Sequence, residues 1–230
     1  MLELTEPQEI IKLVEREVKQ LLQKCHIDEP PVDAYVLAES LGLGVQIDAT
    51  LKTRGYSRRR WDTGTIVVGS KNPSKSERKQ FTIAHEIGEV LLAGKVGQRR
   101  LEEACNLMAV ALLLPREWFG KDAQALGFHL LRLKERYSTV SHEVIAYRML
   151  DFKLLIITIF DNGRLYRRKS SYPGPIKKAY PLELKCHEEV GQKGEERLLE
   201  DEEVVVAGWP VFREDWKRVI LRTELRDIAS

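Results

Sequence analysis

The stretch Gln80–Glu89 has the sequence QFTIAHEIGE, and its His-Glu pair decides how the rest of the chain is interpreted. Residues four apart project from the same face of a helix, so His85 and Glu89 could bind one metal ion together. In the HExxH pattern of zinc peptidases both positions are histidines, and the glutamate after the first one activates a water molecule. The carboxylate at position 89 can still ligate a metal. The stretch therefore predicts an altered metal site, with Glu86 as the candidate general base.

Each of these residues also has a purely structural interpretation. His85 could be a buried, hydrogen-bonded core histidine, and Glu89 a surface or ion-paired residue at an inactivated site. A third ligand has to come from another element. The next predicted helix offers Glu102, with Glu103 beside it, and thermolysin-type peptidases take a glutamate ligand from a following helix. The residues alone leave open whether Glu102, Glu103 or neither of them binds a metal.

Hydrophobic periodicity predicts a mostly helical N-terminal part. The predicted helices span about residues 6–25, 37–41, 74–93 and 99–114, with shorter helices within 116–150. Two strands are predicted at 45–47 and 65–68. Between them lies the basic stretch Lys52–Trp61. It is interpreted either as a solvated loop or as a patch for an acidic partner or nucleic acid.

The composition changes after Asp151. The apolar run Leu154–Phe160 and the turn signal Asp161–Gly163 predict a buried strand that enters a tight turn. Two further apolar runs, Val204–Val206 and Val219–Leu221, predict additional strands. This part of the chain is therefore expected to be rich in strands.

Two domains are predicted. One comprises residues 1–150 and includes the helical segment 116–150, and a small strand-rich one comprises residues 151–230. A chain of 230 residues with 43% hydrophobic and 31% charged residues is long enough for this organisation. The predicted fold class is α+β, because helices and strands are segregated along the chain.

Charge and cysteine content bound the class of protein. Lysine and arginine together number 37 against 35 acidic residues, so bulk charge gives no argument for nucleic-acid or membrane binding. The three cysteines form no CxxC pair, which argues against a disulfide framework and fits a reducing cytoplasm. No signal peptide is visible, and the apolar runs are too short to span a bilayer. We therefore expect a cytoplasmic protein with no membrane association.

Several segments, in the same order along the chain, resemble the ImmA/IrrE family of metallopeptidases. Gln80–Gly88 (QFTIAHEIG) is similar to the family's RFTIAHELGH block up to its last residue, and Glu102–Pro115 (EEACNLMAVALLLP) to the block written ExEANxFAxxLLMP. Gly64–Val68 resembles the family's edge strand, and Tyr137–Leu150 its closing helix-turn-helix-like segment. The resemblance covers roughly residues 8–150, and HEIGE stands where the family has HExxH.

The resemblance implies a small zincin-like (gluzincin-like) metalloprotease domain with helix-turn-helix-like helices. It implies that His85 and Glu102 are metal ligands, that Glu86 is the general base, and that Glu89 replaces the second ligand histidine. Asn106 would orient one of the ligands by a hydrogen bond without contacting the metal itself, or else it would be an ordinary polar residue of the helix. The implied cofactor is one divalent ion, zinc, with manganese as the alternative because carboxylates favour harder ions.

The strand near Thr65 is the expected substrate site. Zinc peptidases commonly bind substrate as an added antiparallel strand, through main-chain hydrogen bonds. Since Gly64–Val68 resembles an edge strand, Thr65, Ile66 and Val67 are expected to pair with the substrate backbone.

The resemblance implies a regulatory endopeptidase that cleaves a helix-turn-helix transcriptional repressor in a stress, phage, mobile-element or defence circuit. Residues 151–230 would then sense a signal or recruit the substrate. The first alternative is a catalytically inactive relative that binds and sequesters its repressor partner. The second is a nucleic-acid-linked regulator that uses the basic loop and the helices of residues 128–150.

Overall fold

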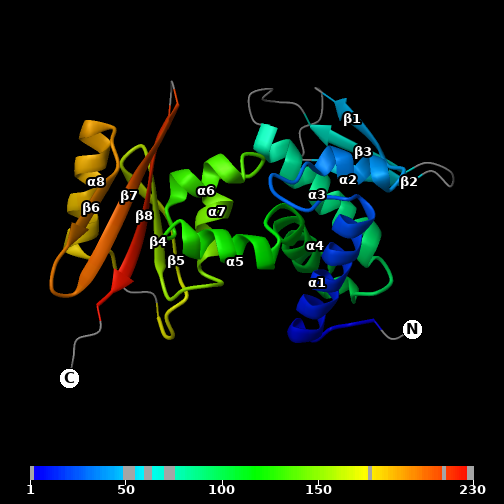
Figure 1. The fold of residues 1–230 in the computed structure, drawn as a ribbon, viewed down its shortest axis with the longest axis horizontal. Coiled ribbons are helices and arrows are strands. Elements are labelled where there is room, and N and C mark those ends of the chain that lie inside the picture. The colour runs from blue at the N-terminus through cyan, green and yellow to red at the C-terminus, as the bar shows by residue number, and fades with distance from the viewer. Residues whose placement is uncertain are drawn as a thin grey trace. The chain divides into compact units, whose positions relative to one another are not determined.

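The structure is a computed structural model that describes residues 3–48, 55–59, 64–69, 76–175, 178–213 and 216–226 (Figure 1). The chain divides into two compact units, one of Met1–Ala125 with Lys134–Ser141 and one of Leu126–Leu133 with His142–Ser230. This division differs from the boundary after residue 150 that the sequence analysis places, because two helical segments pack with the second unit. The functional domain boundary at residue 150 stays a prediction.

Helices dominate the first unit. They are α1 (Pro7–Lys24), α2 (Ala34–Ser40), α3 (Ser76–Leu92), α4 (Gln98–Leu113) and α5 (Arg116–Ala125), and the strands are β1 (Gly44–Asp48), β2 (Gly55–Arg59) and β3 (Gly64–Gly69). α1 shows why periodicity finds such helices. Its buried residues include Ile10, Val14 and Val18, which lie on one face at helical spacing, and Pro7 occupies its first turn, where no N–H is needed. The helices predicted in this part of the chain are confirmed over the described residues, and the predicted start of one of them at residue 74 lies outside these residues.

The three strands of the first unit form a sheet in the order β1-β3-β2. β3 pairs in parallel with β1 and antiparallel with β2, so that Ile66 lies between Val45 and Ser57. The prediction of a loop at Lys52–Trp61 is wrong for residues 55–59, which form β2. Pairing with β3 satisfies their backbone groups, and this outweighs the basic character of the stretch. The rest of that stretch lies outside the described residues.

A polar contact anchors the start of α2 against α3. Asp33 caps α2, because its carboxylate accepts a hydrogen bond from the Tyr35 N–H at 2.8 Å. Gln80, a buried residue of α3, donates to the same carboxylate at 2.9 Å and accepts from the Ala34 N–H at 2.6 Å. The first half of α3 is thereby fixed one turn before His85.

The second unit is built on a five-stranded antiparallel sheet. Across the sheet the strands are β5 (Arg164–Ser170), β4 (Ile156–Asp161), β8 (Trp216–Leu225), β7 (Val204–Arg213) and β6 (Arg197–Glu200). The helices are α8 (Pro181–Lys193), α7 (His142–Met149) and α6 (Leu130–Arg136), whose first four residues belong to this unit. The strand-rich character of this region is confirmed, whereas α8 was not predicted.

α8 covers one face of this sheet (Figure 1). Cys186 and Val190 of α8 pack in one cluster with Val206, Val219 and Leu221, which alternate with residues of the opposite face along β7 and β8. This alternation buries one side chain of every two against the helix and forms the core of the second unit.

A buried carboxylate lies within the same interface. Glu183 of α8 is fully buried and accepts hydrogen bonds from Thr158 at 3.0 Å and Thr223 at 2.7 Å. It forms an ion pair of 2.7 Å with Arg168, and its second oxygen accepts from the Tyr180 N–H at 2.7 Å. Both carboxylate oxygens are therefore satisfied, as a buried charge requires.

Arg222 lies on the other face of the sheet. Its guanidinium donates to the carbonyl oxygens of Gly127 and Phe128, each at 2.7 Å, and lies 5.7 Å from the Trp209 ring. Gly127 and Phe128 have positive φ values of 61° and 55°. A strand arginine thus holds the segment that begins the second unit.

The α+β class is confirmed by these helices and sheets. Within the described residues, no helix combines the length and the apolar character needed to cross a membrane.

Candidate metal centre

The backbones of α3 and α4 approach closely at Gly88. A Cβ placed on Gly88 would lie 3.2 Å from the Cα of Cys105 and 3.2 Å from the Cβ of Met108. Glycine therefore allows the helices to meet at the turn that follows the His-Glu pair. The sequence analysis did not single out Gly88. The signal that could have identified it is a lone glycine inside a helical pattern.

The three predicted ligands lie together at this helix pair. The His85 Nε2 atom is 4.0 Å from Glu89 Oε1 and 3.5 Å from Glu102 Oε2. One ligand atom from each of the three side chains lies within 4.8 Å of the others. Ligand atoms around a tetrahedral zinc ion are ~3.3 Å apart, since each lies about 2.0–2.2 Å from the metal. The separations of 3.5 Å and 4.0 Å from the imidazole nitrogen are close to that spacing.

The cluster opens to solvent on its carboxylate side. The side chain of His85 is 14% exposed, while those of Glu89 and Glu102 are 40% and 77% exposed. The imidazole is therefore held by its surroundings, and the carboxylates have room to adjust. Such a set fits a divalent cation that enters from solvent.

Asn106 orients the carboxylate of Glu102. Its amide donates to the Glu102 carbonyl oxygen at 2.8 Å and to Glu102 Oε1 at 3.4 Å, while Oε2 is the atom that faces His85. Glu103, the competing candidate, instead forms an ion pair of 2.7 Å with Arg100. The structure thus brings Glu102, and not Glu103, to the cluster.

Glu86 is buried next to these ligands, with only 4% of its surface exposed. The pKa of Cys105 shows that Glu86 lies near the ligands. Burial raises this pKa to about 12, and the carboxylates of Glu89, Glu102 and Glu86 contribute to the increase. Three acidic side chains therefore concentrate negative charge at one point of the α3–α4 interface. Negative charge of this kind attracts a divalent cation.

The residues predicted to bind substrate do not lie at a sheet edge. Thr65 of β3 pairs with Gly44 on one side and with Arg58 on the other, so both backbone edges of β3 are occupied. Ile66 is fully buried and Val67 is 5% exposed. β3 is therefore not the edge strand that the sequence analysis expects, because strand addition requires a free edge. A role of Thr65, Ile66 and Val67 in substrate binding stays a prediction.

Comparison with known proteins locates these residues within a family domain. The IrrE N-terminal-like domain, Peptidase_M78, matches residues 38–150. A comparison with curated proteins gave no significant match. Among solved structures, a Mycobacterium tuberculosis transcriptional regulator is similar, with a TM-score of 0.61 and 16% sequence identity over 93% of this chain and 79% of its own. At that identity the likeness shows a shared fold alone. Through residues 38–150, the chain belongs to the IrrE N-terminal-like family of peptidases.

Proposed function

We propose that this chain is a metal-dependent endopeptidase that cleaves a helix-turn-helix transcriptional repressor. The observation that carries the proposal is the convergence of His85, Glu89 and Glu102 on one point, with Glu86 buried beside them. The regulatory role rests on the family and on the fold shared with a transcriptional regulator. The circuit would be a stress, phage, mobile-element or defence response.

His85, Glu89 and Glu102 would hold one divalent cation, zinc or manganese. A cation bound there would supply Lewis-acid chemistry to the scissile carbonyl and to the attacking water. The Glu86 carboxylate would take a proton from that water and deliver it to the leaving amide nitrogen. Asn106 would keep Glu102 Oε2 turned toward His85, since it engages the other oxygen.

The substrate backbone would pair with β2. β2 is an outer strand of the three-stranded sheet, on the opposite side of β3 from β1, and it contacts α3. An extended segment added to β2 would therefore run beside the helix that carries the metal ligands. Hydrogen exchange of residues 55–59 should slow when a product peptide is bound, whereas unchanged exchange there would contradict this binding mode.

Metal content and affinity test the centre directly. We expect stoichiometric zinc or manganese in the purified protein by elemental analysis, and its loss in His85→Ala and in Glu102→Ala. Glu103→Ala is the matched control, because Glu103 contacts Arg100 and should keep the metal. A protein that binds neither ion would overturn the proposal.

Glu86→Gln separates catalysis from binding. The variant should keep its metal and lose cleavage of a peptide library, read by mass spectrometry as new N-termini, with rates down about 10²-fold or more. The replacement of the family's second histidine by Glu89 favours one alternative, an inactive relative that sequesters its repressor. That alternative predicts no cleavage by the metal-loaded wild type and equal repressor binding by Glu86→Gln.

A further inference from the structure

The two outer strands of the five-stranded sheet carry opposite charge. β5 has the sequence RLYRRKS, with four basic residues and no acidic one. β6 and its flanks, residues 195–203, have the sequence EERLLEDEE, with six acidic residues and one basic. β5 and β6 lie at opposite edges of the sheet (Figure 1). One sheet therefore presents a basic edge and an acidic edge.

The positive charge of β5 is available at the surface. Arg164, Arg167 and Lys169 are exposed, and within the described part of the chain none of them forms an ion pair. Their neighbours are aromatic: Arg167 lies 5.2 Å from the Tyr166 ring, and Lys169 lies 4.2 Å from the Tyr147 ring. These cations are therefore available to an acidic partner.

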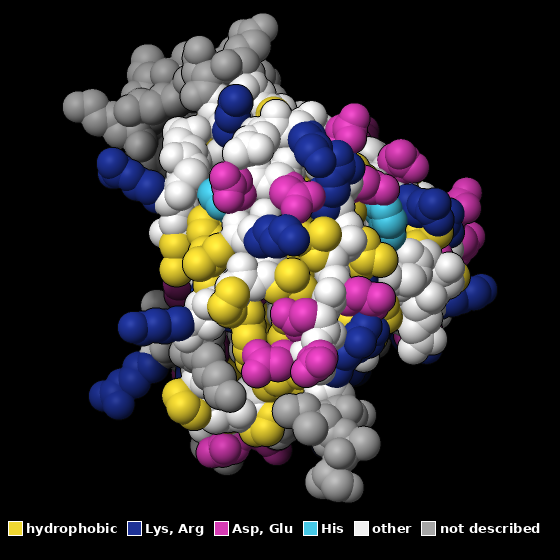
Figure 2. All heavy atoms as spheres, turned by 90° about the vertical axis from the view of Figure 1, so that its left-hand side faces the viewer, with side chains coloured by type: hydrophobic (Ala, Val, Ile, Leu, Met, Phe, Trp, Pro, Cys, Tyr) yellow, Lys and Arg dark blue, Asp and Glu magenta, His cyan; other side chains and the backbone are white. Residues whose placement is uncertain are grey.

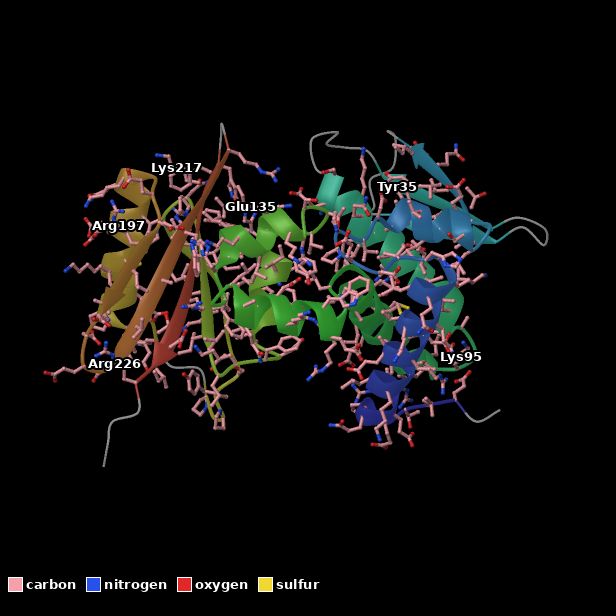
Figure 3. All side chains as sticks on the ribbon, in the orientation of Figure 1. Tyr35, Lys95, Glu135, Arg197, Lys217 and Arg226 are labelled. Carbon is pink, nitrogen blue, oxygen red and sulfur yellow. The ribbon has the colours of Figure 1, made fainter. Side chains whose placement is uncertain are left out.

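The negative charge at β6 is only partly balanced within the chain. Glu200 pairs with Arg226, Glu195 forms an ion pair of 2.8 Å with Arg197, and Glu196 lies 3.1 Å from His129. Arg226 and Arg197, the two basic residues near this edge, are labelled in Figure 3. Glu202 and Glu203 are exposed and form no ion pair among the described residues. Figure 2 shows acidic, basic and apolar side chains interspersed on the face that includes α8 and β6.

β5 and β6 also carry exposed apolar side chains. Leu198 of β6 is 67% exposed, and Leu165 and Tyr166 of β5 are 54% and 47% exposed. Large apolar residues on a sheet edge favour pairing with another strand. Charged residues on an edge strand can serve only to prevent pairing with other strands. Exposed apolar residues on the same strand have the opposite effect, so the combination favours pairing with a partner of opposite charge.

We propose that β5 of one copy of this chain pairs with β6 of a second copy. Two β5 strands repel each other, and so do two β6 strands, which blocks symmetric pairing of like edges. The β5–β6 pair brings opposite charges together and covers Leu165, Tyr166 and Leu198. The edge charges therefore select one pairing and exclude the other two.

Such pairing is heterologous, because each copy uses two different surfaces. It produces either a closed ring or an open chain of subunits. β6 has only four residues, so each interface is small and the association is weak. We therefore expect assembly that depends on protein concentration and is reversed by salt.

Sedimentation velocity of the full chain provides the first test. The mean sedimentation coefficient should rise as protein concentration increases from about 1 μM to about 200 μM at low salt. It should return toward the monomer value when NaCl is raised from about 50 mM to about 500 mM, which screens the edge charges. A chain that stays monomeric over the whole range at low salt would overturn the proposal.

Charge-reversal variants identify the edges. Arg164→Glu/Arg167→Glu/Lys169→Glu leaves three acidic residues and one basic residue on β5, so both edges of that variant are acidic. Glu195→Lys/Glu200→Lys/Glu202→Lys/Glu203→Lys leaves five basic and two acidic residues in 195–203, so both edges of that variant are basic. Each should be monomeric alone, whereas an equimolar mixture should assemble, because acidic β5 of one meets basic β6 of the other. A mixture that remains monomeric would refute edge pairing even if the wild type associates.

Two further variants distinguish strand pairing from a general attraction between charged surfaces. Lys185→Glu on the exposed surface of α8 reverses a charge away from both edges and should leave assembly unchanged. Leu198→Asn keeps every charge and should weaken assembly, provided that its melting temperature matches that of the wild type. Assembly unaffected by Leu198→Asn would contradict strand pairing, since charge attraction alone would then be sufficient.

Discussion

Gly88 and Cys105 meet across the α3–α4 interface with no space for a side chain between them. A Cβ on Gly88 would lie 3.2 Å from the Cys105 Cα and 3.3 Å from its carbonyl oxygen. Both are backbone atoms, which cannot rotate away as a side chain can. The separation of the two helices, and with it the distance between His85 and Glu102, therefore depends on this glycine.

Gly88→Ala should push α3 and α4 apart by a few tenths of an ångström. We expect a lower melting temperature, from overpacking that costs about 1–3 kcal/mol, together with weaker metal binding. Differential scanning calorimetry and metal titration would measure the two effects.

Gly191→Ala on α8 is the control for that variant. A Cβ at Gly191 has nothing within 4 Å, so alanine there should raise stability by up to about 1 kcal/mol through helix propensity. If both alanine variants stabilise the protein, the α3–α4 contact does not constrain the two helices.

Glu89→His would give the proposed metal set two imidazoles and one carboxylate. We expect zinc affinity to rise roughly tenfold or more and manganese affinity to fall, because imidazole suits zinc and carboxylate suits harder ions. Competition with a chromophoric chelator measures both. Glu103→His adds a histidine beside the site but outside it, and should change neither affinity. Unchanged affinities in Glu89→His would show that residue 89 does not bind the metal.

Glu183→Gln should strongly destabilise the second unit. The substitution leaves the Arg168 guanidinium, whose side chain is 7% exposed, without its buried counter-charge. Breaking one partner of a buried ion pair costs about 3–5 kcal/mol. Chemical denaturation would measure this loss. Glu188→Gln on the exposed side of the same helix should change stability by less than ~0.5 kcal/mol, and a similar loss in both variants would contradict the prediction.

The stability of the second unit should decrease at alkaline pH. Burial, followed by the charges of Glu189 and Glu183, raises the pKa of Cys186 from 9.0 to about 12. The unfolded chain releases this proton above pH 9.0, while the folded chain keeps it, so the unfolded state binds fewer protons in that range. Stability is therefore complete below pH 9.0 and falls as the pH rises toward 12, by up to about 1.4 kcal/mol per pH unit.

Melting temperatures at about pH 7.5 and about pH 10.5 would measure this dependence. Cys186→Ala should reduce it, although the variant starts from a lower stability because of the cavity. Cys25→Ala removes a partly exposed thiol and should leave the dependence as it is in the wild type. An equal slope in all three proteins would contradict the assignment to Cys186.

The sequence predicted the helices of the metal centre well because their signals are local. The spacing of His85 and Glu89 places both on one helix face without any tertiary information. Only the family resemblance predicts that Glu102 of the next helix is the third ligand, because Glu103 is an adjacent carboxylate on the same helix. The choice between them is made by Arg100, which engages Glu103, and by Asn106, which engages Glu102.

Strand order could not be predicted in the same way. β3 lies in the middle of its sheet because β2 forms from a basic stretch whose composition favours a loop, and pairing partners are not a local property. α8 had usable signals that were missed. Pro181 stands in its first turn, the Glu183 carboxylate accepts a hydrogen bond from the Tyr180 N–H, and Gly194 ends it with a φ of 68°.

The contact of Arg222 with Gly127 and Phe128 has a consequence for synthesis on the ribosome. Gly127 precedes the arginine that binds its carbonyl by 95 residues. At translation rates of about 5–20 residues per second, Arg222 is synthesised on the order of 5–20 s after Gly127 and Phe128. The second unit should therefore complete its folding only after most of the chain has emerged, so nascent chains stalled before β8 are expected to be protease-sensitive around residue 127.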